Sequence, residues 1–92
     1  MGASTIRLVV HGKVQGVGFR FAACQEASHC AVSGWVRNLP DGSVEIIAQG
    51  SSEALDRMTS WACRGPRHAV VDDVEVEKLT SSAEYHAFEI RR

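Results

Sequence analysis

The residues best placed to do chemistry lie in one short stretch, Gly12-Lys13-Val14-Gln15-Gly16-Val17-Gly18-Phe19-Arg20. Glycines let backbone N–H groups turn inward around a small anion, because no Cβ atom is in the way. A helix that begins here would add unpaired N–H groups and the positive end of its dipole. Arg20 would add a permanent charge with forked donors that suit a pair of phosphate oxygens. The stretch therefore predicts a phosphate-binding loop with Arg20 at its end, formed by Gln15, Gly16, Val17, Gly18 and Phe19.

This loop differs from the common nucleotide-binding loops. It lacks the Gly-Lys-Ser/Thr ending that supplies a magnesium ligand in P-loop proteins. Gly12, Gly16 and Gly18 also miss the Gly-x-Gly-x-x-Gly spacing of dinucleotide sites. The stretch therefore predicts a phosphate-binding loop that is not of the common nucleotide-binding kind.

The elements on either side of the loop must position it. Ile6, Leu8 and Val10 alternate with other residues, which predicts a strand before the loop. From Phe19 to about Ala31 the pattern predicts a helix. Its apolar stripe is expected to comprise Phe21, Cys24, Ala27 or Ser28, and Ala31.

The rest of the chain reads as a hairpin, a second helix and two further strands. Residues 32–38 and 43–49 have strand patterns on either side of the turn sequence Leu39-Pro40-Asp41-Gly42. A helix is predicted to start at residues 50–53 and to stop at Arg64-Gly65-Pro66. Residues 70–79 form the next predicted strand, with a bulge at Asp72-Asp73. A short final strand contains Tyr85, Phe88 and Ile90.

This order of elements predicts an α+β fold of the ferredoxin-like, split βαβ type over residues 1–92 as one domain. In that βαββαβ arrangement, two helices cover one face of an antiparallel sheet and the other face can meet water. The phosphate-binding loop then lies at the end of the first strand and the start of the first helix.

Composition limits the possible partners. A net charge of −1 gives no general attraction to nucleic acid or to an anionic membrane. No apolar run approaches the ~18 residues of a membrane span, and the N-terminus lacks the features of a secretion signal. Three cysteines without C-x-x-C spacing indicate reduced, mostly buried thiols, and four scattered histidines indicate no metal site. We therefore expect a cytoplasmic monomer without a metal or cofactor.

A second segment, Gly34-Trp35-Val36-Arg37-Asn38 with Asp41-Gly42-Ser43-Val44 following, completes a pair of motifs. Together with the glycine loop it resembles the acylphosphatase family, and the similarity extends over nearly the whole chain. The resemblance implies hydrolysis of acyl phosphates to a carboxylate and inorganic phosphate, without metal or cofactor. It also implies that Arg20 and Asn38 carry the chemistry. The chain departs from many relatives at Ala23 and Cys24, where they have a threonine.

The reaction makes limited chemical demands. A carboxylate with a pKa of roughly 4 to 5 leaves without a general acid, so the task is to stabilise charge and to position water. Arg20 and the backbone N–H groups of the loop would hold the phosphoryl oxygens. The amide of Asn38 would aim a water at phosphorus. Because neither motif offers a base, the proton of that water is expected to pass to the substrate phosphate.

Two alternatives compete with this interpretation. One is an RNA-recognition domain, whose aromatic strand is superficially similar to Gly16-Val17-Gly18-Phe19-Arg20-Phe21. Here, however, this segment begins a helical pattern, and the chain has no excess of basic residues. A phosphate-binding module without turnover is the second alternative. Asn38 argues against it, because a protein that only binds phosphate needs no residue to align a water.

Overall fold

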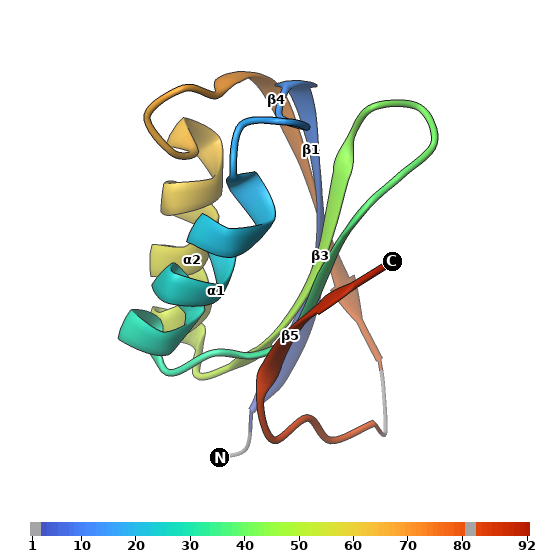
Figure 1. Ribbon diagram of the computed structural model, residues 1–92. Helices are drawn as coiled ribbons and strands as arrows, with labels where there is room; N and C mark the ends of the chain where they lie inside the picture. Colours follow the sequence, from blue (N-terminus) through green and yellow to red (C-terminus); the bar gives the residue numbers. More distant parts are fainter. Residues whose placement is uncertain (1–2, 81–82) are drawn as a thin grey trace.

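The computed structural model describes residues 3–80 and 83–92. Two helices lie on one side of a five-stranded sheet in this part of the chain (Figure 1). In chain order the elements are β1 (Ser4–Lys13), α1 (Phe19–Cys30), β2 (Ser33–Asn38), β3 (Val44–Gly50), α2 (Ser52–Arg64), β4 (Val70–Leu79) and β5 (Phe88–Arg91). The strand order across the sheet is β4-β1-β3-β2-β5. The predicted ferredoxin-like βαββαβ fold is confirmed.

The fifth strand makes the sheet mixed. β1 pairs antiparallel with β3 and β4, and β2 pairs antiparallel with β3, as predicted. β5 instead runs parallel to β2, from the pair Gly34–Phe88 to the pair Arg37–Arg91. β4 ends at the end of the sheet where β2 begins. A strand that starts there and returns along the sheet must therefore run in the direction of β2.

Helix α1 buries a different face from the predicted one. Its buried residues are Phe19, Ala23, Ala27 and Cys30, whereas Phe21 and Ala31 are exposed. The expected stripe is therefore correct at Ala27, correct in part at Cys24, which is half-buried against the core, and wrong at Phe21 and Ala31. The cause is Phe19, the first helical residue, whose ring packs on Trp61 of α2 at 5.1 Å between centroids. The helical repeat that continues from Phe19 turns Phe21 outward.

Helix α2 agrees with the sequence-based prediction at both ends. The Ser51 side chain caps it by accepting a hydrogen bond from the Ala54 N–H at 3.1 Å. Gly65 follows the last turn with a positive φ of 70°. Leu55, Met58 and Ala62 lie on its buried face.

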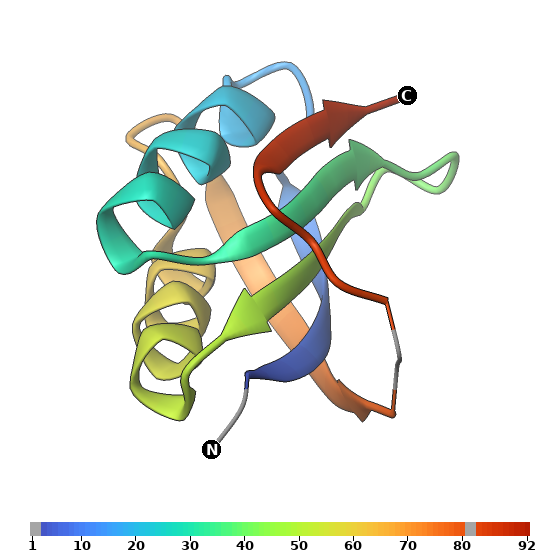
Figure 2. The same ribbon diagram turned by 90° about the horizontal axis from the view of Figure 1, so that it is seen from below.

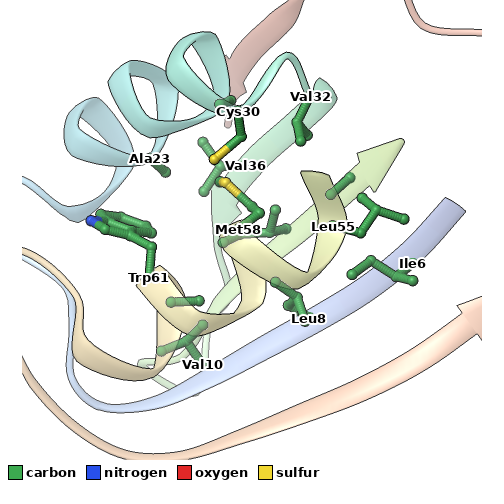
Figure 3. Close-up of a cluster of buried hydrophobic side chains, with 14 of the residues drawn as sticks. Ile6, Leu8, Val10, Ala23, Cys30, Val32, Val36, Leu55, Met58 and Trp61 are labelled. Carbon is green, nitrogen blue, oxygen red and sulfur yellow. The ribbon is translucent and has the colours of Figure 1, made fainter. Parts of the chain in front are cut away.

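The core lies between the two helices and the face of the sheet they cover. Figure 3 shows β1 contributing Ile6, Leu8 and Val10, and α2 contributing Met58 and Trp61. Side chains from α1 and β2 close the layer from the other side, among them Ala23, Cys30 and Val36. This layer fixes α1 against the sheet, and with it the loop between β1 and α1.

The sheet face away from the helices is partly covered, although the sequence suggested that it could meet water. Residues 83–87, before β5, lie over part of this face (Figure 2). The buried side chain of Gln49 holds this segment, since it donates to the Ala83 carbonyl at 2.8 Å and accepts from the Tyr85 N–H at 3.0 Å. On the same face, the guanidinium groups of Arg37 and Arg91 lie over the buried ring of Trp35, 5.1 and 4.9 Å from its centroid.

The predicted bulge in β4 is present. His11 pairs with Asp73 and Gly12 pairs with Val71, which leaves Asp72 without a partner in β1. At this point Gly12 has a φ of 128°, and a Cβ atom there would lie 2.1 Å from the Val70 carbonyl oxygen. Only glycine fits this close approach, which lies where the chain leaves β1 for the loop.

The cysteines differ in exposure. Cys30 is buried, Cys24 is half-buried and Cys63 is exposed on α2, so the expectation of mostly buried thiols is correct for Cys30 alone. Burial raises the pKa of the Cys24 thiol. Within residues 3–80 and 83–92, none of the helices has the length and apolar character to cross a bilayer.

Candidate active site

The glycine loop connects β1 to α1 at the end of the sheet where the β2–β3 turn also lies (Figure 1). Gly16 and Gly18 both have left-handed φ angles, 75° and 78°. A side chain is rarely tolerated in that conformation, which in a loop allows successive N–H groups to turn toward one anion. In the described residues, no backbone carbonyl accepts a hydrogen bond from the N–H groups of Gly16, Val17 or Gly18. The loop therefore offers free donors next to the start of a helix.

Arg20 lies in the first turn of α1, directly after this loop. Its side chain is half-buried, and it forms no ion pair with any carboxylate in the described chain. Arg7 and Arg37 differ, because both are held by Glu45 on the other face of the sheet. The guanidinium of Arg20 is therefore free to bind an anion supplied from outside the chain.

Asn38 is the last residue of β2 and comes from the second motif. It lines the same surface pocket, of about 280 Å³, as Arg20, Gly16, Gly18 and Phe19. The fold thus brings Arg20 and Asn38, which are 18 positions apart in the sequence (38 − 20), to one pocket. An oxyanion bound at the loop would have the Asn38 amide beside it.

Gln15 and Val17 are the predicted loop residues that do not line this pocket. Val17 is half-buried and packs against the core. The side chain of Gln15 points to the β2–β3 turn, where its Nε2 donates to the carbonyl oxygens of Leu39 at 2.8 Å and Ser43 at 2.9 Å. Any contact of these two residues with a phosphoryl group would therefore have to come from their backbone.

The turn that follows Asn38 is closed by its own hydrogen bonds. The Leu39 N–H donates to the Ser43 carbonyl at 2.9 Å. The Asp41 carboxylate accepts from the Ser43 hydroxyl and from the Ser43 N–H, and these bonds lower the pKa of Asp41 below its ordinary value. Asn38 therefore lies at the end of a strand, directly before a turn that the hydrogen bonds of Leu39 and Asp41 with Ser43 hold in place.

Four further residues line the pocket that were not predicted from the sequence: Val14, Phe21, Ile90 and Arg92. The place of Phe21 depends on which side of α1 is buried, and the contact of Phe19 with Trp61 decides this. The local sequence around Ile90 and Arg92 does not signal their place either. They reach the pocket because β5 runs parallel to β2, with Ile90 paired to Val36.

Ala23 and Cys24 lie away from this pocket. Ala23 is fully buried in the core. Cys24 instead lines a different pocket of about 610 Å³, between α1 and the segment before β5, together with Tyr85 and His86. None of the predicted site residues borders that larger pocket.

The chemistry available in the smaller pocket follows from its lining. Among the described residues there, the polar side chains are Arg20, Asn38 and Arg92, and none is a carboxylate, an imidazole or a thiol. No group of three or more potential metal-ligating side chains occurs in the part of the chain that the structure describes. The pocket can thus neutralise and orient an anion and can orient a water, and its side chains include no proton acceptor of ordinary basicity.

Comparison with known proteins agrees with the geometry. The acylphosphatase family model matches residues 6–90. An acylphosphatase from Rubrobacter xylanophilus is 46% identical over 94% of this chain and 78% of its own length. The structures of acylphosphatases from Coxiella burnetii and Bacillus subtilis superpose with a TM-score of 0.93 each, at 36% and 37% identity. These alignments cover 98% and 97% of this chain and 94% and 99% of the two solved chains. With this sequence match, this fold and this pocket, the chain belongs to the acylphosphatase family.

Proposed function

We propose that this chain hydrolyses the carboxyl–phosphate bond of small acyl phosphates and releases a carboxylate and inorganic phosphate. The observation that carries the proposal is the shared pocket of Arg20, Asn38, Gly16 and Gly18. An unpaired guanidinium beside free backbone donors suits a phosphoryl group, and an amide next to it suits the water that attacks.

In the proposed reaction, the loop from Gln15 to Phe19 and the guanidinium of Arg20 hold the phosphoryl oxygens. Asn38 accepts a hydrogen bond from a water and directs its oxygen at phosphorus, opposite the acyl oxygen. A bond forms between the water oxygen and phosphorus as the bond from phosphorus to the acyl oxygen breaks. The electron pair leaves with the carboxylate, and the water proton passes to a phosphoryl oxygen.

Metal independence is part of the proposal. The positive charge that the transition state needs is assigned to Arg20, and the leaving carboxylate needs neither a Lewis acid nor a general acid. The donor set supports this assignment, since the described lining residues of the pocket include no carboxylate that would hold Mg²⁺.

We propose a cytoplasmic monomer that acts on small molecules and needs neither nucleic acid nor membrane. Free thiols at Cys24, Cys30 and Cys63 fit a reducing compartment. Light scattering during gel filtration tests the monomer, since a mass near 10.0 kDa is expected.

Steady-state hydrolysis of benzoyl phosphate, followed by its ultraviolet absorbance, tests the function. The protein is first dialysed against EDTA, and the rate is compared with and without added Mg²⁺ or Zn²⁺. We expect turnover that chelation does not change. No turnover with benzoyl phosphate or acetyl phosphate would overturn the proposed activity. Activity that is lost on chelation and restored by a metal would overturn the mechanism.

A further inference from the structure

Large apolar side chains are exposed at the pocket that holds Arg20 and Asn38. Phe21 is 65% exposed and Ile90 is 45% exposed, and both line that pocket. The other two large hydrophobic residues that are exposed in the described chain, Val70 and Val76, lie on the edge strand β4. Apolar surface gains free energy when it leaves water, so exposed apolar groups beside a polar binding site mark a place where a ligand can cover them.

The two side chains reach the pocket from different elements. Phe21 follows Arg20 in the first turn of α1. Ile90 lies in β5, paired with Val36, which is two residues before Asn38. The apolar surface therefore adjoins both residues to which the reaction is assigned. When the phosphoryl group of a small molecule binds at the loop, the rest of that molecule lies in the same pocket as Phe21 and Ile90.

We propose that Phe21 and Ile90 form the acyl-binding part of the pocket and select acyl phosphates with an apolar acyl group. The inference rests on the proposed function, because it concerns the other end of the same substrate. The loop and Arg20 hold the phosphoryl group, so the acyl carbon must lie one atom away from it, across the bridging oxygen. The apolar surface beside Arg20 then receives the chain or ring attached to that carbon.

Arg92 supplies the competing possibility. Arg91 pairs with Arg37, so the next residue, Arg92, comes beside Asn38 and lines the pocket. A cation there would favour an acyl group that carries a second negative charge. Arg92 is exposed, however, and a solvated cation contributes little to binding because water screens its charge. Removal of the Phe21 and Ile90 side chains from water contributes more free energy of binding than Arg92 does, and this contribution depends less on salt.

A series of acetyl, butyryl and hexanoyl phosphate tests the selection, because the three leaving acids have nearly the same acidity. Full burial of one methylene group is worth about a fourfold gain in binding, so partial burial of four predicts a kcat/KM about tenfold higher for hexanoyl than for acetyl phosphate. The gain should lie in KM, since the contact is away from the reacting bond. Phe21→Ser and Ile90→Ser should each lower the hexanoyl-to-acetyl ratio about threefold or more.

Val76→Ser is the matched control, because it removes an apolar side chain of similar exposure on β4. It should leave the hexanoyl-to-acetyl ratio of the wild type unchanged. Equal kcat/KM values across the series, or an unaltered ratio in both Phe21→Ser and Ile90→Ser, would overturn the inference. A higher kcat/KM for succinyl phosphate than for butyryl phosphate, lost in Arg92→Ser, would overturn it in favour of an anionic acyl group.

The proposed function and this inference fail in different ways. If the wild type cleaves none of the acyl phosphates, the proposed function is wrong and the inference falls with it. If acetyl phosphate is cleaved and Arg20→Gln abolishes that turnover, the proposed function stands. The hexanoyl-to-acetyl ratio of kcat/KM then tests only the role of Phe21 and Ile90.

Discussion

The side-chain amide of Gln15 donates a hydrogen bond to the carbonyl oxygen of Leu39 at 2.8 Å, across 24 positions of sequence. Leu39 directly follows Asn38, and the same amide also donates to Ser43 at the other side of the turn. These two bonds connect the glycine loop to the strand end at which Asn38 lies. We therefore propose that Gln15 is a positioning residue, which holds together the parts of the pocket that come from the two motifs.

Replacement of Gln15 by leucine should lower kcat with acetyl phosphate by about tenfold to a hundredfold, because small displacements of reacting groups cost rates of this order. Gln15→Glu should be worse at neutral pH, since its carboxylate would face two carbonyl oxygens. It should recover part of the rate as the pH falls and the carboxyl gains a proton that it can donate. Initial rates between pH 4 and 8 measure this.

The control for that experiment is Gln25→Leu, which changes an exposed glutamine of α1 outside the pocket. Urea unfolding should show that Gln15→Leu is still folded under assay conditions. If Gln15→Leu turns over like Gln25→Leu, and Gln15→Glu has the pH profile of the wild type, Gln15 does not position the site.

Local patterns predicted most of this fold. Ser51 and Gly65 at the ends of α2, and the alternation of Leu8 and Val10 in β1, depend on neighbouring residues and backbone geometry. The face of α1 was mispredicted because Phe19, Phe21 and Cys24 are all apolar. Only the contact between Phe19 and Trp61, which are far apart in sequence, decides which side is buried.

The pocket residues that belong to local motifs were predictable, whereas those that depend on long-range strand pairing were not. Arg20 and Asn38 were assigned by motif, and the sheet brings them to one pocket. The contribution of Ile90 and Arg92 depends on the parallel pairing of β5 with β2. That pairing follows a segment held by Gln49, which nothing in the local sequence of β5 signals.

Arg20→Gln should reduce kcat/KM for benzoyl phosphate by at least a hundredfold and weaken inhibition by inorganic phosphate. Loss of one transition-state donor costs on the order of 10²–10³ in rate, and this donor also carries charge. Arg20→Lys should recover little, because a lysine is a point charge without the forked donors. Arg67→Gln, which removes an exposed arginine outside the pocket, should behave as the wild type. More than a tenth of wild-type activity in Arg20→Gln would refute the assignment.

Asn38→Ala should lower kcat strongly and leave the inhibition constant of inorganic phosphate nearly unchanged. The reason is that Asn38 is assigned to the attacking water, whereas the loop and Arg20 are assigned to the phosphoryl oxygens. Kinetics with phosphate as a competitive inhibitor separate the two effects, and circular dichroism checks the fold. A parallel loss of rate and phosphate affinity would make Asn38 a phosphate ligand instead.

Glu45 should make stability depend on pH. It is a buried carboxylate that accepts from Arg7 Nε at 2.5 Å and from Arg37 Nε at 2.6 Å. Burial alone would raise its pKa, but the two arginines outweigh burial and lower the pKa below the ordinary value of 4.5. The folded state therefore gains stability from Glu45 above pH 4.5, and this gain is lost as the pH falls through the lower folded pKa.

Glu45→Gln should accordingly lower the free energy of unfolding by about 2 kcal/mol at pH 7, the order expected for charged hydrogen bonds at a buried group. The difference from the wild type should shrink as the pH falls below 4.5. Urea unfolding across this range measures it. Glu75→Gln, at an exposed pair with His11, should cost about 0.5 kcal/mol or less. A constant difference at every pH would show that the charge of Glu45 is not the cause.

The rate should depend steeply on the acidity of the leaving group, because no side chain in the described lining of the pocket can protonate a leaving oxygen. Benzoyl and acetyl phosphate should be cleaved well, para-nitrophenyl phosphate poorly, and glycerol phosphate hardly at all. ATP should also be poor, since the loop has no P-loop lysine and no magnesium ligand to neutralise a triphosphate. A panel of these substrates at one pH, with released phosphate as the readout, gives the comparison. Similar rates for acetyl phosphate and glycerol phosphate would require a general acid and would contradict the proposed mechanism.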